Sequence, residues 1–162
     1  MSKDPELDTY NEPAAALEPV GPDEASPTRI LLAEDEPAFR ELLREALVGE
    51  GYHVVEAADG LELREHLQRD PPYDLVVSDV RMPRASGVEV LEWNFVRDPR
   101  TRFLLITAFG DAAIHARASE FEVTVLDKPF DLDEFLIQVR ALVEHWGPDL
   151  GWSLDLDEVE GD

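Results

Sequence analysis

Residues 74–83 read Asp-Leu-Val-Val-Ser-Asp-Val-Arg-Met-Pro, an apolar run that ends in an aspartate and a proline-containing turn. A run of this kind, apolar at successive positions, predicts a strand that is covered on both faces, as in a parallel sheet. Asp79 stands out because a carboxylate at the end of a buried strand is costly unless it has a partner. The stretch therefore indicates a layered α/β fold with an acidic group at one edge of its sheet.

Short apolar runs and segments with helical periodicity alternate on both sides of this strand. Strands are expected over residues 29–33, 52–57, 74–78, 102–107 and 122–126. Helices are expected over residues 37–49, 59–69, 86–96, 111–119 and 131–146. Strict alternation predicts a five-stranded parallel sheet with helices on both faces and right-handed crossovers.

The helix starts carry local signals. Pro37 occupies a first-turn position where its missing N–H has no cost, and Arg40 and Arg44 fall on the side of this helix predicted to face water. Asp59 is expected to cap the second helix, and Asp131 with Glu134 gives the last helix a start resembling a capping box. These signals support the helical boundaries.

The periodic region, residues 29–146, is predicted to be one domain between two acidic flanks. Residues 1–28 contain five prolines and seven acids, which predicts a disordered arm. Residues 147–162 contain six acids and no base and are predicted to be a tail, although apolar residues such as Trp152 and Leu154 also suit a segment that folds onto a partner.

Composition excludes several classes of function. The 162 residues include 37 acids and 14 bases, a net charge of −23, which argues against direct binding to nucleic acid or anionic lipid. No cysteine is present, so disulfides, thiolate metal sites and a catalytic thiol are excluded, and four dispersed histidines do not suggest zinc. With no apolar run near the roughly 18 residues of a membrane helix and no leader-like start, a cytoplasmic protein is expected.

Acidic residues follow two of the predicted strands. Glu34 and Asp35 come directly after the first strand, and Asp79 follows the third. Because ligands bind beyond the carboxyl ends of parallel strands, where strand order reverses, we expect these side chains to meet. Several carboxylates in close contact require a compensating cation, and their hard oxygen ligands favour Mg²⁺.

The end of the fifth predicted strand carries a distinctive base. Of thirteen basic residues in the folded region, twelve are arginine, and Lys128 is the only lysine. A compact ammonium at a strand end can pair with a carboxylate or with a phosphoryl oxygen. Lys128 is therefore a candidate functional residue beside the acids.

Four separated motifs resemble the receiver domains of bacterial two-component response regulators. They are residues 30–37, Ile-Leu-Leu-Ala-Glu-Asp-Glu-Pro; residues 75–83 with Gly87 following; residues 106–108, Ile-Thr-Ala; and residues 127–130, Asp-Lys-Pro-Phe. The resemblance covers residues 29–146 and implies a flavodoxin-like (βα)5 fold with strand order 2-1-3-4-5. It also implies a cis bond between Lys128 and Pro129.

The resemblance implies a phosphorylation switch. Asp79 would accept a phosphoryl group from a histidine kinase or phosphotransfer protein, Lys128 would pair with a phosphoryl oxygen, and the Thr107 hydroxyl would hydrogen-bond to the phosphoryl group. The expected protein is a stand-alone receiver that changes its binding to a downstream protein. It would be no enzyme beyond its own phosphorylation and dephosphorylation, and a monomer or a weak phosphorylation-dependent dimer.

The resemblance also implies a magnesium site. Its ligands would be Asp35 and Asp79, the backbone carbonyl of Arg81, and Glu34 directly or through water. Glu34 replaces the commoner aspartate of the family, and this substitution lengthens the reach of the carboxylate by one methylene.

Two further departures concern signal output. Val125 stands where the family often has an inward-turning tyrosine or phenylalanine, and a β-branched aliphatic residue cannot make that movement. Phe121 and Glu122 replace a customary Gly-Ala. These departures motivate a first alternative, a pseudo-receiver that binds its partner without phosphorylation. A second alternative is a phosphatase of the haloacid-dehalogenase type, although such enzymes usually have an aspartate where this chain has Arg81.

Overall fold

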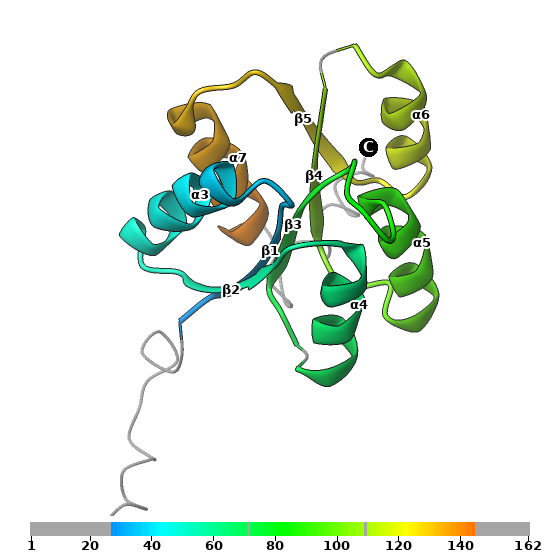
Figure 1. The fold of residues 1–162 in the computed structure, drawn as a ribbon, viewed down its shortest axis with the longest axis horizontal. Coiled ribbons are helices and arrows are strands. Elements are labelled where there is room, and N and C mark those ends of the chain that lie inside the picture. Colours follow the sequence, from blue (N-terminus) through cyan, green and yellow to red (C-terminus); the bar gives the residue numbers. More distant parts are fainter. Residues whose placement is uncertain (1–26, 71, 109, 145–162) are drawn as a thin grey trace, which may run out of the picture.

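The computed structural model describes residues 27–70, 72–108 and 110–144. Strands and helices alternate through this part of the chain (Figure 1). They are β1 (Arg29–Ala33), α3 (Pro37–Gly49), β2 (His53–Ala57), α4 (Gly60–Arg69), β3 (Leu75–Asp79), α5 (Gly87–Arg97), β4 (Phe103–Ala108), α6 (Ala112–Glu120), β5 (Thr124–Lys128) and α7 (Leu132–Glu144). The tail predicted for residues 147–162 lies outside the described residues, as does the arm predicted for residues 1–28 apart from its last two.

The strands form one parallel sheet in the order β2-β1-β3-β4-β5. This arrangement confirms the predicted fold class and strand order. Strand order reverses between β1 and β3, so the residues that follow these two strands lie side by side. Among the described residues, no helix is both long and apolar enough to cross a membrane.

Helices α3 and α7 cover one face of the sheet, and α4, α5 and α6 cover the other (Figure 1). Successive residues of each strand point to opposite faces of the sheet and pack into two hydrophobic cores, one on each face. On β1, Ile30 and Leu32 pack toward α3 and α7, whereas Leu31 packs toward α4 and α5. All three are fully buried, and burying a leucine or isoleucine side chain contributes about 1.5–3 kcal/mol. Double-sided burial explains why these strands are apolar at successive positions.

Side chains cap the helix starts. The Asp59 carboxylate accepts a hydrogen bond from the Glu62 N–H at 2.9 Å, and Asp131 accepts one from the Glu134 N–H at 2.8 Å. The reciprocal capping box occurs at the start of α5, between Ser86 and Glu89. The predicted caps at Asp59 and Asp131 are thus confirmed.

The strand boundaries differ most at β5, which was expected over residues 122–126 and instead spans Thr124–Lys128. The cause is the turn that ends α6. The Phe121 N–H donates to the Ala118 carbonyl at 2.9 Å, and Glu122 has a positive φ of 58°, which a strand residue does not adopt. Lys128 consequently belongs to the last position of the strand.

Candidate functional site

The structure brings together the charged residues at the carboxyl ends of β1, β3 and β5. The Lys128 Nζ lies 3.1 Å from the Asp79 Oδ1 and 4.0 Å from the Glu34 Oε1. Each of these residues lies at or directly after the end of its strand, and β3 separates β1 from β4 and β5 in the sheet. Residues 34, 79 and 128, far apart in the sequence, therefore form one cluster.

Three carboxylates form the acidic part of this cluster. Glu34, Asp35 and Asp79 each offer an oxygen, and these oxygens all lie within 4.8 Å of one another. Glu34 is 2% exposed and Asp79 is 6% exposed, whereas Asp35 is exposed. Two buried acids and one exposed acid leave an open side from which a hard cation can enter with water ligands.

Glu34 is held by its own turn. The Glu36 N–H donates to the Glu34 Oε2 at 3.0 Å, but the Oε1 is buried and has no hydrogen-bond partner among the described residues. Burial is the main cause that raises the pKa of Glu34 to about 7, and the charges of Asp79 and Asp35 add to it. A carboxylate oxygen without a hydrogen-bond partner in an acidic cluster fits a cation ligand, so glutamate at this position is compatible with the predicted site.

Asp79 has opposing neighbours. Burial raises the pKa of Asp79 above its usual value, and the adjacent Lys128 ammonium acts in the opposite direction. A lysine at 3.1 Å favours the ionised carboxylate, which is the form that can act as a nucleophile. The lysine thus offsets part of the cost of burying this carboxylate.

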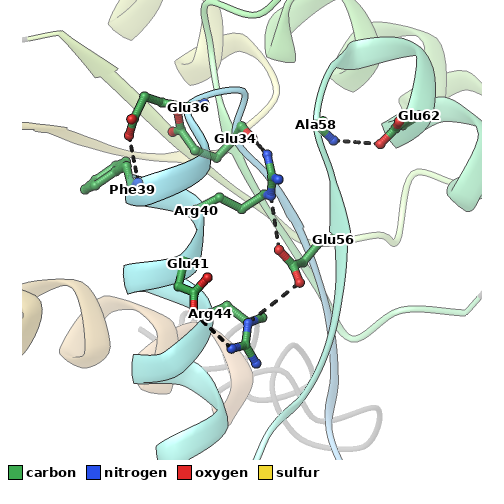
Figure 2. Close-up of polar contacts among 9 residues, drawn as sticks. All are labelled: Glu34, Glu36, Phe39, Arg40, Glu41, Arg44, Glu56, Ala58 and Glu62. Carbon is green, nitrogen blue, oxygen red and sulfur yellow. Dashed lines mark hydrogen bonds and ion pairs between the residues drawn. The ribbon is translucent and has the colours of Figure 1, made fainter.

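Arg40 supports the turn after β1 (Figure 2). Its Nη1 donates to the Glu34 carbonyl at 2.8 Å, and its Nε donates to Glu56 of β2 at 3.0 Å. Arg44 lies near the same Glu56 carboxylate at 3.7 Å. The prediction that Arg40 faces water is wrong, because its side chain is only 21% exposed and ties α3 to two strands.

Close backbone packing positions Asp79. The Val80 N–H donates to the Ile106 carbonyl at 2.9 Å, and the Gly87 N–H donates to the Val80 carbonyl at 2.8 Å. A Cβ at position 87 would lie 2.5 Å from the Asp79 carbonyl oxygen, so only glycine fits at the start of α5. The glycine that follows the Met-Pro turn thus lets α5 begin directly against the strand that carries Asp79.

Aromatic residues support Lys128. The Lys128–Pro129 bond is cis, as the resemblance implied. The Lys128 Nζ lies 5.0 Å from the centre of the Phe39 ring, and Phe130 packs between Phe39 and Phe135. No signal in the sequence indicated that Phe39 would lie against the lysine.

Thr107 is 2% exposed, and its hydroxyl donates to the Asp111 Oδ2 at 3.3 Å. The same Asp111 oxygen lies 3.5 Å from the Arg81 Nη2. A pocket of about 690 Å³ is lined by Asp35, Arg81 and Asp111 together with Met82 and Pro83. The sequence predicted Asp111 only as a helix start, and its spacing of four residues from Thr107 was the one available hint.

Two departures from the family pattern have structural consequences. Val125 pairs with Leu105 of β4 and is partly buried against the core between the sheet and α4–α6. Phe121 packs edge-to-face against Phe95 of α5, with ring centroids 5.0 Å apart. The first departure lies on the strand that carries Lys128, and the second lies at the opposite end of the sheet.

Comparison with known proteins agrees with this geometry. The response regulator receiver domain model matches residues 30–140. Response regulator MprA of Mycobacterium sp. (strain KMS) is 38% identical over 130 residues, or 77% of this chain and 54% of that protein. The chain thus spans about half the length of MprA.

Two further relatives are matched over most of their length. Sporulation initiation phosphotransferase F of Bacillus subtilis (strain 168) is 35% identical over 113 residues, or 69% of this chain and 90% of that protein. The crystal structure of response regulator protein TrrA from Thermotoga maritima, in complex with Mg(2+)-BeF, has a TM-score of 0.65 and 33% identity and covers 71% of this chain and 98% of that one. The fold, the strand-end cluster and these matches together show that the chain belongs to the response regulator receiver domain family.

Proposed function

We propose that this chain is a stand-alone, phosphorylation-dependent receiver in which Asp79 accepts the phosphoryl group. Receiver domains are phosphoryl-accepting signalling modules that interact with histidine kinases or phosphotransfer proteins. The observation that carries the proposal is the 3.1 Å contact between the Lys128 Nζ and the Asp79 Oδ1, inside a cluster of acids from two other strands. The contact fits a nucleophilic carboxylate with a cation ready to receive a phosphoryl oxygen.

The proposed reaction transfers a phosphoryl group from a phosphohistidine to Asp79. An Asp79 carboxylate oxygen forms a bond to phosphorus, the bond between phosphorus and the histidine nitrogen breaks, and that nitrogen keeps the electron pair. The Lys128 ammonium then pairs with a phosphoryl oxygen. The Thr107 hydroxyl, which now donates to Asp111, would donate to the phosphoryl group instead. This exchange of partner would couple phosphorylation to the loop after β4.

We propose that Glu34, Asp35, Asp79 and the backbone carbonyl of Arg81 hold Mg²⁺. Receiver domains bind Mg²⁺ at an acidic pocket, and the TrrA structure contains Mg(2+)-BeF. The clustered carboxylates, and a Glu34 Oε1 that has no hydrogen-bond partner among the described residues, support the assignment. When bound, the ion supplies positive charge that neutralises the phosphoryl oxygens during transfer.

The proposed partners are a histidine kinase or phosphotransfer protein and a downstream protein whose binding changes on phosphorylation. We propose a cytoplasmic monomer, or a weak dimer that depends on phosphorylation. The chain matches 90% of phosphotransferase F, which supports a receiver that acts without an output domain. It matches only 54% of MprA, so MprA contains a long stretch of sequence outside the match.

The test is the mass of the intact protein after incubation with acetyl phosphate and Mg²⁺. We expect wild type to gain one phosphoryl group, Asp79→Asn to gain none, and Asp133→Asn, which removes an exposed acid on α7, to behave as wild type. Absence of a mass gain in wild type, or equal labelling of Asp79→Asn, would contradict the proposal.

Two further measurements, partner binding and phosphate release, separate the two alternatives. Asp79→Asn with unchanged partner binding would favour a pseudo-receiver, the alternative that rests on Val125 and on Phe121 and Glu122. Sustained phosphate release from generic phosphate esters would favour a phosphatase of the haloacid-dehalogenase type. Against that alternative, position 81 is an arginine whose guanidinium lies 3.5 Å from Asp111.

A further inference from the structure

A second pocket lies at the end of the sheet where β4 and β5 begin, opposite the acidic cluster. Its volume is about 440 Å³. The loop between α5 and β4, the turn between α6 and β5, and Leu142 in the last turn of α7 form its walls. We call it the base pocket and define it by Phe95, Arg100, Arg102, Phe121 and Leu142.

The walls of the base pocket include exposed aromatic surface. Phe95 is 41% exposed, and its ring packs edge-to-face on Phe121. Both rings line the base pocket. A further aromatic or aliphatic side chain that packs on these two partly exposed rings would bury apolar surface.

The rim of the base pocket is cationic. The Arg100 side chain is 82% exposed and reaches Asp98 only at 3.4 Å. Arg102 also lines the pocket, and burial lowers the pKa of its guanidinium from the usual value. Among the described residues that line the pocket, Glu122 is the one acid. In a chain with a net charge of −23, two arginines above an apolar wall favour an acidic segment that also carries apolar side chains.

Residues 147–162 have this chemistry. They contain six acids and no base, and Trp152, Leu154 and Leu156 alternate with Ser153, Asp155 and Asp157. In an extended chain, alternation directs the apolar side chains to one side and the acids to the other. The segment follows α7, whose residue Leu142 already lines the base pocket. Trp152 is eight residues beyond Glu144, and eight extended residues reach up to about 26 Å.

We propose that residues 147–162 dock in cis on the base pocket, with Trp152 against Phe95 and Phe121 and the acidic side chains toward Arg100 and Arg102. Docking covers the exposed aromatic surface and leaves the acidic cluster, at the other end of the strands, accessible to a phosphoryl donor. The inference depends only on the base pocket and this segment, and it stands whether or not Asp79 is phosphorylated.

The test uses the full chain, which has no cysteine of its own. A nitroxide spin label on Ser153→Cys broadens the amide signals of nearby residues in a ¹⁵N-labelled sample. We expect the amides of Thr101, Phe121 and Val123 to lose most of their intensity and to recover when the label is reduced. The matched control is the same label on Ser2→Cys, in the other acidic flank, which should leave these three signals unchanged.

Reversing the charge at Arg100 tests whether the arginines of the base pocket hold the segment. Adding Arg100→Glu to the Ser153→Cys chain should restore at least half of the lost intensity, while Arg69→Glu, on α4, should restore none. No localised broadening, or broadening centred on the α4–α5 surface around Trp93, would overturn the proposal. Broadening of the pocket amides that disappears on dilution would also overturn it, because it would show docking between two copies of the chain.

Discussion

The interior of the sheet and the carboxyl-terminal edge of the same strands respond differently to burial. Val77 is fully buried, and removing its apolar surface from water stabilises the fold. Asp79, two residues later on the same strand, is 6% exposed, yet burial raises its pKa and disfavours its charge. Similar burial therefore stabilises the fold at Val77 but carries an unfavourable electrostatic energy at Asp79.

The difference shows which part of the domain carries unfavourable electrostatic energy. In the interior every contact adds to the stability of the folded chain. At the edge, Glu34 and Asp79 are held close together by the backbone, and among the described residues the Lys128 ammonium is the cation that lies against both of them. Removing apolar side chains from the interior should consequently lower stability, whereas removing a charge from the edge should raise it.

The largest expected effect is a loss in the interior. Leu104 is fully buried in the middle of β4. Leu104→Ala should lower the free energy of unfolding by about 3 kcal/mol, because it removes apolar contacts and leaves a cavity. Urea denaturation measures the change. Val96→Ala, at a residue that is 83% exposed, is the control and should change stability by less than about 0.5 kcal/mol.

The second-largest expected effect is the pH dependence of the free energy of unfolding, which Glu34 at the edge of the sheet should cause. The pKa of Glu34 is about 7 in the folded chain, against an ordinary value of 4.5. The folded state therefore keeps a proton that the unfolded state loses between these pH values. The free energy of unfolding without Mg²⁺ should fall by on the order of 2 kcal/mol as pH rises through this window, then level off.

The matched measurement compares wild type with Glu34→Gln in thermal melts from pH 4.5 to pH 8 without Mg²⁺. The difference between the two melting temperatures isolates Glu34, since Asp79 titrates in both chains. A constant difference across the window would contradict the raised pKa.

Removing the charge at Asp79 should increase stability, and this change is expected to be smaller than the pH effect at Glu34. Asp79→Asn relieves the crowding of acids and should raise the free energy of unfolding without Mg²⁺ by between about 1 and 2 kcal/mol. Added Mg²⁺ should stabilise wild type more than the variant. Equal melting temperatures of the two chains without Mg²⁺ would argue against a strained edge.

The smallest expected change concerns a polar group that lies inside the domain. Asn94 on α5 is 4% exposed, and its Nδ2 has no hydrogen-bond partner among the described residues. Asn94→Leu should raise the free energy of unfolding by about 1 kcal/mol, because an unsatisfied amide is replaced by apolar contacts. A loss of stability in urea denaturation would show that the amide has a role in the fold.

The interior was predictable from the sequence for a simple physical reason. Strands covered on both faces must be apolar at successive positions, and β1, β3 and β4 have this pattern. Their order in the sheet does not follow from the pattern and came from the resemblance to receiver domains. The start of β5 was wrong by two residues because the positive φ of Glu122 leaves no trace in apolar periodicity.

The site was predictable only in part. Glu34, Asp79 and Lys128 were found because charged residues stand at the ends of apolar strands. Asp111 and Arg40 were not found as site residues, since their contacts with Thr107 and the Glu34 carbonyl depend on loop and helix geometry. A charged residue that follows an apolar strand can be recognised from its neighbours in the sequence, whereas the contacts of Asp111 and Arg40 depend on the folded structure.

The most direct measurement is a Mg²⁺ titration of the ¹⁵N-labelled chain at pH 7.5, followed by amide chemical shifts. We expect saturation at one site, with the largest shifts at Glu34, Asp35, Asp79 and Arg81, and with loss of the response in Asp79→Asn. Shifts that do not saturate, or that spread over exposed acids such as Glu41 and Glu65, would contradict a single divalent-ion site at the carboxyl ends of the strands.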